Sequence, residues 1–147
     1  SINLMKTSDK DIVFNFFSRE VHHVKSDIEQ LNRVFINLFK NSIESLKEKH
    51  EKEGNFQKKI DVEIQLINDY INILVQDNGT GFIKNDLKTL SKPYFTTKKE
   101  GSGLGLSIVE KILNDHNGFI EFISQKQGAK IKILLPKYVN WNFNNWR

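Results

Sequence analysis

The chain contains no cysteine and only two prolines among its 147 residues. The absence of cysteine excludes a disulfide framework, a zinc–thiolate site and a cysteine nucleophile. No apolar run approaches the roughly 20 residues that span a bilayer, and the polar first ten residues lack the apolar region of a signal peptide. We therefore expect a cytoplasmic domain, and a membrane anchor of the intact protein would lie outside this chain.

The composition is that of a soluble globular protein, with 38% hydrophobic and 27% charged residues. The length fits one domain and leaves little room for two. The net charge of +4 suits an anionic ligand, but a mildly basic balance does not by itself indicate nucleic acid. We expect no nucleic-acid partner.

The hydropathy pattern predicts two long helices and three pairs of short strands. Asp27 is placed to cap a helix that runs to Glu53, and a second helix is expected at 104–117, ended by Gly118. Strands are expected at 12–17, 20–24, 59–66, 70–76, 119–124 and 130–135. This order predicts an α+β fold in which helices cover one face of a mixed sheet.

The segment 77–105 breaks the periodic pattern and holds five glycines, with one short helical turn expected near 85–90. Stretches of this length without strong periodicity are often functional. The last eleven residues carry Trp141, Phe143 and Trp146, so this tail either packs on the body or serves as a linker or partner contact.

The first long helix carries a polar stripe formed by Asn37, Lys40, Asn41 and Glu44, which fall within about 100° of one another on a helical wheel. A solvated face normally lies opposite one apolar stripe, whereas this stripe has apolar residues on both sides. The pattern indicates a partly buried groove whose amide oxygens suit Mg²⁺. The alternative is an ordinary helix surface with two asparagines.

The motif Asp77-Asn78-Gly79-Thr80-Gly81 follows directly after a strand that the pattern predicts to be buried. A carboxylate at a strand end accepts a hydrogen bond from an exocyclic amine such as that of adenine, and glycines let a flat base approach the backbone. Asp-Asn-Gly is equally typical of an ordinary turn.

A second glycine motif, Gly101-Ser102-Gly103-Leu104-Gly105-Leu106, opens the second long helix. Glycines before a helix N-terminus present amide N–H groups and a positive dipole end to phosphates. Lys98 and Lys99 lie just before this loop, within reach of a terminal phosphate. The alternatives are a flexible hinge and a solvated pair of lysines.

Four segments occur in one order: Asn37-x-x-x-Asn41, Asp77-x-Gly79-x-Gly81, Tyr94-Phe95-Thr96-Thr97-Lys98 and Gly101-x-Gly103-Leu104-Gly105. Together they resemble the N, G1, F and G2 boxes in the ATP-binding domain of bacterial sensor histidine kinases, relatives of gyrase, the heat-shock-90 chaperones and the MutL proteins. The resemblance covers about 27–136, and the Phe-Thr-Thr-Lys box is similar to the nitrogen-regulation subtype.

This resemblance implies a two-layer α/β sandwich, with an ATP-binding catalytic domain at 1–136, a lid at about 79–105 and a C-terminal tail at 137–147. By position it assigns Asn41 and Asn37 to Mg²⁺ and Asp77 to the adenine amine, with Gly79 and Gly81 as the floor of the base pocket. Lys40 becomes a supporting phosphate contact. The remaining phosphate contacts would be Thr96, Thr97, Lys98, Gly101, Ser102, Gly103, Leu104, Gly105 and Leu106.

The resemblance also implies the reaction. Asn37 and Lys98 would be the catalytic residues, and an amide in place of a carboxylate cannot act as a general base, which favours transfer to histidine over hydrolysis. The two-helix segment that carries the phosphoacceptor in the family is missing, since only residues 1–26 precede the first predicted helix. His22 and His23 do not replace it, because they lie in a predicted strand without the acceptor motif. We therefore expect the acceptor histidine on a separate dimerisation domain, a response regulator downstream and a homodimeric intact protein.

One departure from the family concerns the residues after Gly128, where a hydroxyl-bearing pair often supports the adenine water network. Here Ala129 and Lys130 occupy those places, which puts that local contact in doubt. Two other functions stay open on the sequence: a nucleotide-binding signalling module without turnover, and an anti-sigma-type protein-serine kinase.

Overall fold

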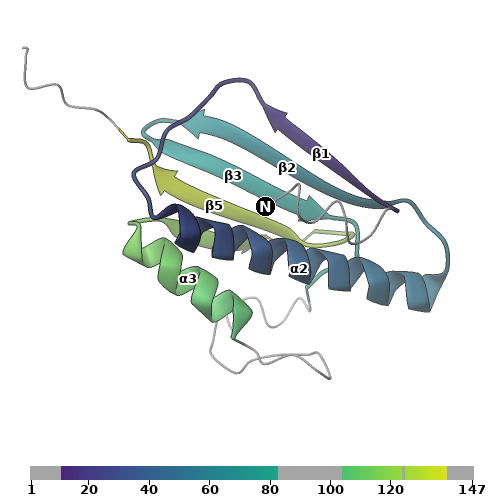
Figure 1. The fold of residues 1–147 in the computed structure, drawn as a ribbon. Helices are drawn as coiled ribbons and strands as arrows, with labels where there is room; N and C mark the ends of the chain where they lie inside the picture. The colour runs from purple at the N-terminus through teal and green to yellow at the C-terminus, as the bar shows by residue number, and fades with distance from the viewer. Residues whose placement is uncertain (1–10, 83–103, 124, 139–147) are drawn as a thin grey trace, which may run out of the picture.

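The computed structural model describes residues 11–82, 104–123 and 125–138. Figure 1 shows two helices lying in front of a single sheet. In chain order the elements are β1 (Ile12–Ser18), α2 (Ile28–Glu53), β2 (Lys58–Ile67), β3 (Tyr70–Asp77), α3 (Gly105–Asp115), β4 (Phe119–Ile123) and β5 (Lys130–Pro136).

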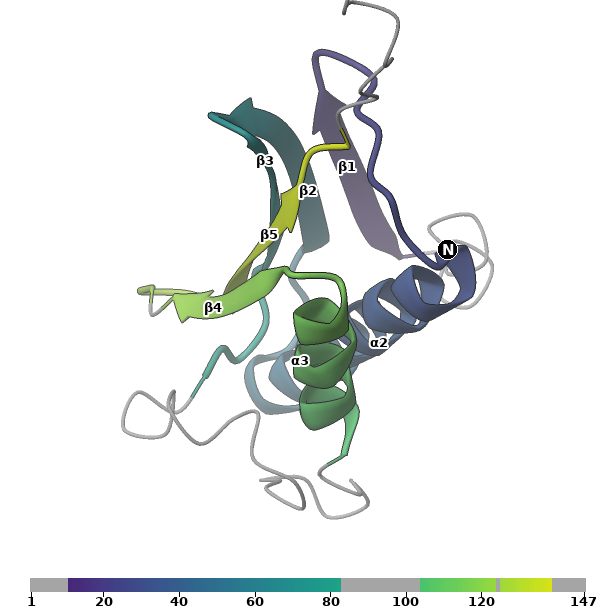
Figure 2. The same ribbon diagram turned by 90° about the vertical axis from the view of Figure 1, so that its left-hand side faces the viewer.

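The sheet is mixed, with the strand order β1-β2-β3-β5-β4. β1 pairs with β2 in parallel, and the other neighbours pair antiparallel. A parallel pair needs a crossover connection, which α2 provides between β1 and β2. Both helices lie on one face of the sheet, and the other face carries no helix of the described residues (Figure 2). The predicted two-layer arrangement is confirmed.

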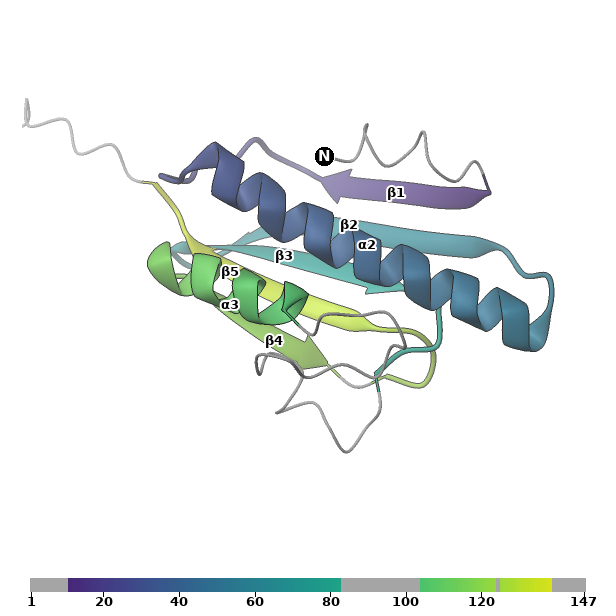
Figure 3. The ribbon, with the colours of Figure 1, turned by 60° about the horizontal axis from the view of Figure 1, so that its bottom comes forward.

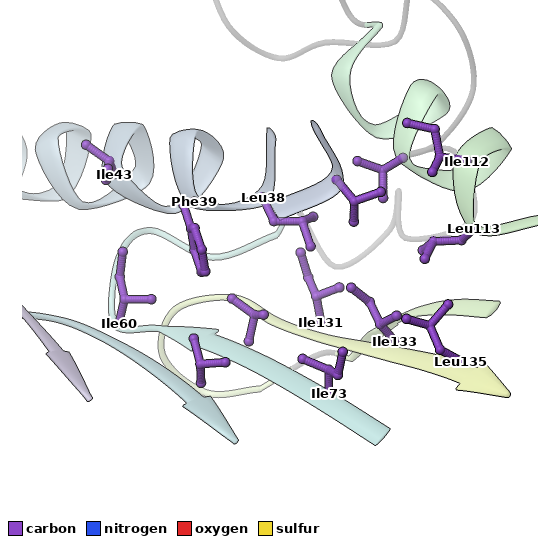
Figure 4. Packing of buried hydrophobic residues seen from close by; sticks show 14 of the residues in the cluster. Leu38, Phe39, Ile43, Ile60, Ile73, Ile112, Leu113, Ile131, Ile133 and Leu135 are labelled. Carbon is purple, nitrogen blue, oxygen red and sulfur yellow. The ribbon is translucent and has the colours of Figure 1, made fainter. Parts of the chain in front are cut away.

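The core lies between α2, α3 and the helix-facing side of the sheet (Figure 4). Every second residue of β2, β3 and β5 points at the helices, because successive side chains of a strand lie on opposite faces of the sheet. Residues paired across neighbouring strands lie on the same face, so these side chains form one continuous layer. The largest side chains with less than 2% exposure are Phe39, Leu38, Leu46, Ile60, Leu113, Ile133, Val34, Val75 and Val109. Burying one such aliphatic or aromatic side chain contributes about 1.5–3 kcal/mol, so this layer contact holds the domain together.

The start of α2 is fixed by Asp27, as predicted. Its carboxylate accepts hydrogen bonds from the backbone N–H groups of Glu29 (2.9 Å) and Gln30 (3.2 Å). The backbone N–H of Asp27 donates to Nε2 of His116, at the end of α3, over 3.0 Å. The cap therefore also ties the beginning of one helix to the end of the other.

The predicted strand at 20–24 is wrong. These residues form no strand, and the carbonyl of His23 accepts a hydrogen bond from the N–H of Tyr138 (2.9 Å). The segment carries the chain from the end of β1 to the start of α2, from the sheet layer to the helix layer. β1 pairs with β2, which comes after α2 in the sequence. A local alternation of apolar residues does not encode a pairing between segments so far apart in the chain.

The other strand predictions are confirmed to within one residue at each end, apart from Ser124, which lies outside the described residues. The predicted helical turn near 85–90 and the tail residues 139–147 also lie outside them. Within the described ranges, no helix is both long and apolar enough to cross a bilayer.

The second helix ends earlier than predicted, and Asn117 rather than Gly118 takes the left-handed position, with φ 54°. The N–H groups of Asn117 and Gly118 donate to the carbonyls of Asn114 (3.0 Å) and Leu113 (2.7 Å), which is a Schellman ending. Gly118 is needed for close approach instead, since a Cβ there would lie 2.7 Å from the carbonyl oxygen of Leu134.

We expect Asn117→Ala to lower the free energy of unfolding by about 1 kcal/mol, because alanine resists the left-handed conformation more than asparagine does. The matched variant Asn117→Gly should equal or exceed the wild type in urea unfolding, since glycine adopts positive φ without steric cost. Equal stability of the alanine and glycine variants would contradict this account of the helix end.

Candidate functional site

The polar stripe of α2, the glycine motif after β3 and the first residues of α3 meet at one place in the fold. Asp77 is the last residue of β3. Its side chain lies on the helix-facing side of the sheet, since Asp77 is paired with the buried Ile60. Figure 3 shows α3 beginning alongside the middle of α2. The structure therefore brings the strand end, the asparagine-bearing helix and the start of α3 together.

Asp77 is the buried carboxylate of this site, with 4% of its surface exposed. Its Oδ1 accepts hydrogen bonds from the backbone N–H groups of Gly79 (2.9 Å) and Ala129 (3.2 Å). The hydroxyl of Ser42 is a further hydrogen-bond partner of the carboxylate. A carboxylate offers about four lone-pair sites, so three partners leave capacity for one more donor.

Burial raises the pKa of Asp77 above its ordinary value of 3.8. The backbone N–H groups of Gly79 and Ala129, the Ser42 hydroxyl and the charge of Lys49 act in the opposite direction, and desolvation outweighs them. A carboxylate held at such a cost at the end of a strand is a marker of a functional site.

Gly79 and Thr80 are fastened to α2 by Ser45. The Ser45 hydroxyl accepts from the N–H of Thr80 (3.0 Å) and lies 3.1 Å from the Thr80 hydroxyl. A Cβ on Gly79 would lie 2.8 Å from the backbone carbon of Ser45, so only glycine lets the loop come this close. The motif thus packs directly on the helix that carries Asn37 and Asn41.

Gly81 and Gly128 make a second close contact, between the loop after β3 and the loop before β5. Both have positive φ, 79° and 70°, and a Cβ on Gly81 would lie 2.6 Å from the Gly128 carbonyl oxygen. A Cβ on Gly128 would lie 2.8 Å from the Cα of Asn78. These glycines keep the backbone of both loops beside Asp77.

Asn78 has a structural role, as the turn interpretation of the motif predicts. Its side chain accepts from the N–H of Lys59 (2.8 Å) and donates to the carbonyl of Gln57 (2.8 Å). The ammonium group of Lys49 donates to the Asn78 carbonyl over 3.0 Å. The turn is therefore anchored to the start of β2 and to α2.

The amide of Asn37 is oriented toward the start of α3. Its Nδ2 donates to the carbonyl of Arg33, one turn earlier, over 2.9 Å. Its Oδ1 would lie 3.2 Å from a Cβ on Gly105, so the missing side chain of this glycine leaves room beside the amide oxygen. Asn41 follows one turn later on α2 and is half-buried.

The N-terminus of α3 has no capping hydrogen bond from the side chain of its N-cap residue, Leu104. The first N–H groups of a helix need acceptors from outside the helix, which makes them suited to an anion. Leu104, Gly105 and Leu106 are half-buried at this end, and Lys40 is exposed beside Asn41. The other predicted phosphate contacts lie outside the described residues: Thr96, Thr97, Lys98, Gly101, Ser102 and Gly103.

Sequence reasoning missed Ser42, which is buried with 3% exposure and directly follows Asn41. It supplies a hydroxyl to Asp77, whereas Ala129 contributes only its backbone N–H. The hydroxyl partner of this carboxylate therefore comes from α2 and not from the residues after Gly128. The available signal was a serine on the apolar side of this helix, between Leu31 and Phe35 on the helical wheel.

Comparison with known proteins places this arrangement in a family. Residues 26–139 match the model described as "Histidine kinase-, DNA gyrase B-, and HSP90-like ATPase". The chain is 34% identical over 134 residues to a "Putative sensor histidine kinase NtrY-like" of Rickettsia conorii, covering 90% of this chain. It spans about a fifth (21%) of the length of that relative.

Solved structures have the same fold. The catalytic domain of histidine kinase ThkA superposes with a TM-score of 0.76 at 28% identity, over 92% of this chain and 86% of that one. A mycobacterial sensor histidine kinase, MprB, gives 0.78 at 22% identity, over 95% and 91%. The predicted resemblance and the two-layer sandwich are confirmed.

The raised pKa of Asp77 predicts how stability depends on pH. The folded protein holds the Asp77 proton to a higher pH than the unfolded chain does, so this residue destabilises the fold as pH rises from about 4 through its folded pKa. Asp77→Asn keeps a hydrogen-bond acceptor without the charge. In urea unfolding at several pH values, the stability of the wild type relative to this variant should fall as pH rises; a pH-independent difference would contradict the prediction.

Proposed function

The chain belongs to the family of histidine kinase-, DNA gyrase B- and HSP90-like ATPases, and we propose that it is the ATP-binding catalytic domain of a sensor histidine kinase. In this reaction the γ-phosphoryl group of ATP passes to a histidine on a separate dimerisation domain. The observation that carries the proposal is the buried Asp77 carboxylate, which retains one acceptor position beside the asparagine stripe of α2. The relatives named NtrY-like fit the nitrogen-regulation subtype.

Asp77 recognises the adenine base in this proposal. The N–H groups of Gly79 and Ala129 and the hydroxyl of Ser42 orient the carboxylate, and its remaining lone pair accepts from the exocyclic amine. Guanine carries an acceptor oxygen where adenine carries the amine, so it would leave a buried carboxylate facing an oxygen. The site should therefore prefer ATP to GTP.

Asn41 and Asn37 are suited to hold Mg²⁺ between the protein and the phosphates. The described part of the chain contains no cluster of three or more His, Asp and Glu side chains that would hold a metal by itself. Amide oxygens and nucleotide phosphates together form the oxygen-rich coordination that Mg²⁺ prefers. The ion would neutralise phosphate charge during transfer.

The start of α3 and Lys40 would support the phosphates, together with the F and G2 box residues at 94–105. Phosphoryl transfer needs mainly positioning and charge neutralisation from the protein. Asn37, as an amide, cannot activate water as a general base, which favours transfer over hydrolysis. His116, whose ring nitrogens contact Asp27 and Ile112, is engaged in structure and is not available as the acceptor.

We infer that the acceptor lies on a dimerisation domain of the same protein, that a response regulator receives the phosphoryl group next, and that the intact protein is a homodimer. These partners are proposed because the relatives are named sensor histidine kinases. The chain itself spans only about a fifth of the length of the first of them.

Asp77→Ala should weaken Mg-ATP binding at least tenfold and reduce the preference for ATP over GTP, because the adenine amine loses its acceptor. The control is Asp69→Ala, which removes an exposed aspartate at the β2–β3 turn and should leave the affinity unchanged. Isothermal titration calorimetry measures both, and unchanged ATP affinity in Asp77→Ala would remove the site assignment.

With Mg-ATP and a separately supplied dimerisation domain, the chain should place acid-labile phosphate on that domain. Asn41→Ala should lose at least tenfold in rate, since it removes an amide ligand of the ion, whereas Asn32→Ala, exposed on the same helix, should retain it. Acid-stable label on serine would instead identify a protein-serine kinase, and tight binding without transfer a signalling module.

A further inference from the structure

The sheet has two edges, β1 and β4, and they differ in charge. Within the described residues, β1 hydrogen-bonds to a strand on one side only, that of β2. An edge strand presents unpaired N–H and C=O groups, and proteins usually protect such edges with charged residues, prolines or bulges.

The residues of β1 themselves carry none of these protections. Residues Ile12–Ser18 include no charged residue and no proline, and Phe16 and Phe17 are 54% and 56% exposed. β4, at the other edge, carries Glu121 at its centre, paired with Lys132 over 3.3 Å. Self-pairing of β4 about its centre would bring Glu121 against its own copy, whereas β1 has no such obstacle.

We propose that β1 is a self-association edge, at which two copies of this chain pair antiparallel about Asn15 and continue the sheet from one copy into the other. Antiparallel pairing places residues at equal distances from the centre opposite one another. Val13 of one copy then faces Phe17 of the other, and Phe14 faces Phe16. The contact is isologous, since each copy contributes the same strand.

The faces of the strand are compatible with this register. Val13, Asn15 and Phe17 are in register with Lys59, Asp61 and Glu63, on the side of the sheet away from the helices. Phe14 and Phe16 are in register with the buried Ile60 and Val62, on the helix side. Each apolar side chain therefore meets an apolar side chain on its own face, and the amide of Asn15 meets a second amide.

The size of the edge predicts a weak dimer. Seven residues on each side are fewer than the roughly 20–30 of a standard interface, so association should be concentration-dependent. The proposal goes beyond the kinase function and does not rest on it, because no nucleotide enters the contact. A kinase test and an association test can therefore fail independently.

The absence of cysteine allows a direct test of the register. Asn15→Cys places two thiols opposite each other, with Cα atoms about 4.5–5.5 Å apart, within disulfide range. Ser18→Cys, on the same strand and more exposed, would place them about 20 Å apart. Under mild oxidation of the full chain, Asn15→Cys should form covalent dimers at least tenfold faster; equal or reversed rates would overturn the register.

Sedimentation velocity tests the association without a new thiol. The wild type should shift from monomer toward dimer as its concentration rises, and Phe17→Lys should weaken this at least tenfold, because two new charges would lie at the paired edge. Phe119→Lys is the matched control, since Phe119 is 57% exposed on the opposite edge, and it should leave the shift unchanged. A wild type that stays monomeric, or equal effects of both variants, would overturn the proposal.

Discussion

The hydrogen bonds around the buried Asp77 carboxylate are the constraint on which the rest of the site depends. A carboxylate with 4% exposure is stable only when its oxygens are satisfied, and here the partners come from its own turn, from α2 and from the residue before β5. Each partner element must therefore hold its position for the others to keep theirs. The close glycine contacts at Gly79, Gly81 and Gly128 bring the backbones near enough for this.

The helix α2 connects this constraint to the stability of the domain. One side of it supplies Leu38 and Leu46 to the core and Ser42 to Asp77, and the adjoining stripe supplies Asn37 and Ser45 to the site. Because interiors are densely packed, the core contacts fix the rotation of the helix, and the rotation decides which polar groups face the turn after β3. Apolar packing thus positions the polar groups of the site. The free energy gained by burying the core also offsets the cost of desolvating the Asp77 carboxylate.

The two edge strands of the sheet differ in charge. The helices cover one face, and the strand edges remain at β1 and β4, of which only β4 carries a central charge. The edge at β1 lies across the sheet from α3, whose first turn belongs to the candidate site. Binding of a nucleotide and association of two copies would therefore use separate parts of the domain.

The sequence by itself determined most elements, the cap at Asp27, and the family whose motifs surround Asp77 and Asn41, because periodicity, caps and glycine motifs are local signals. It failed at 20–24 and at the end of α3, where the backbone path depends on distant partners. Only the tertiary structure decided that β1 pairs with β2 and that the hydroxyl beside Asp77 comes from Ser42. Other contacts of the site are equally distant in the sequence: Ser45 and Thr80 are 35 positions apart, and Asp77 and Ala129 are 52 positions apart. No local sequence pattern encodes such contacts.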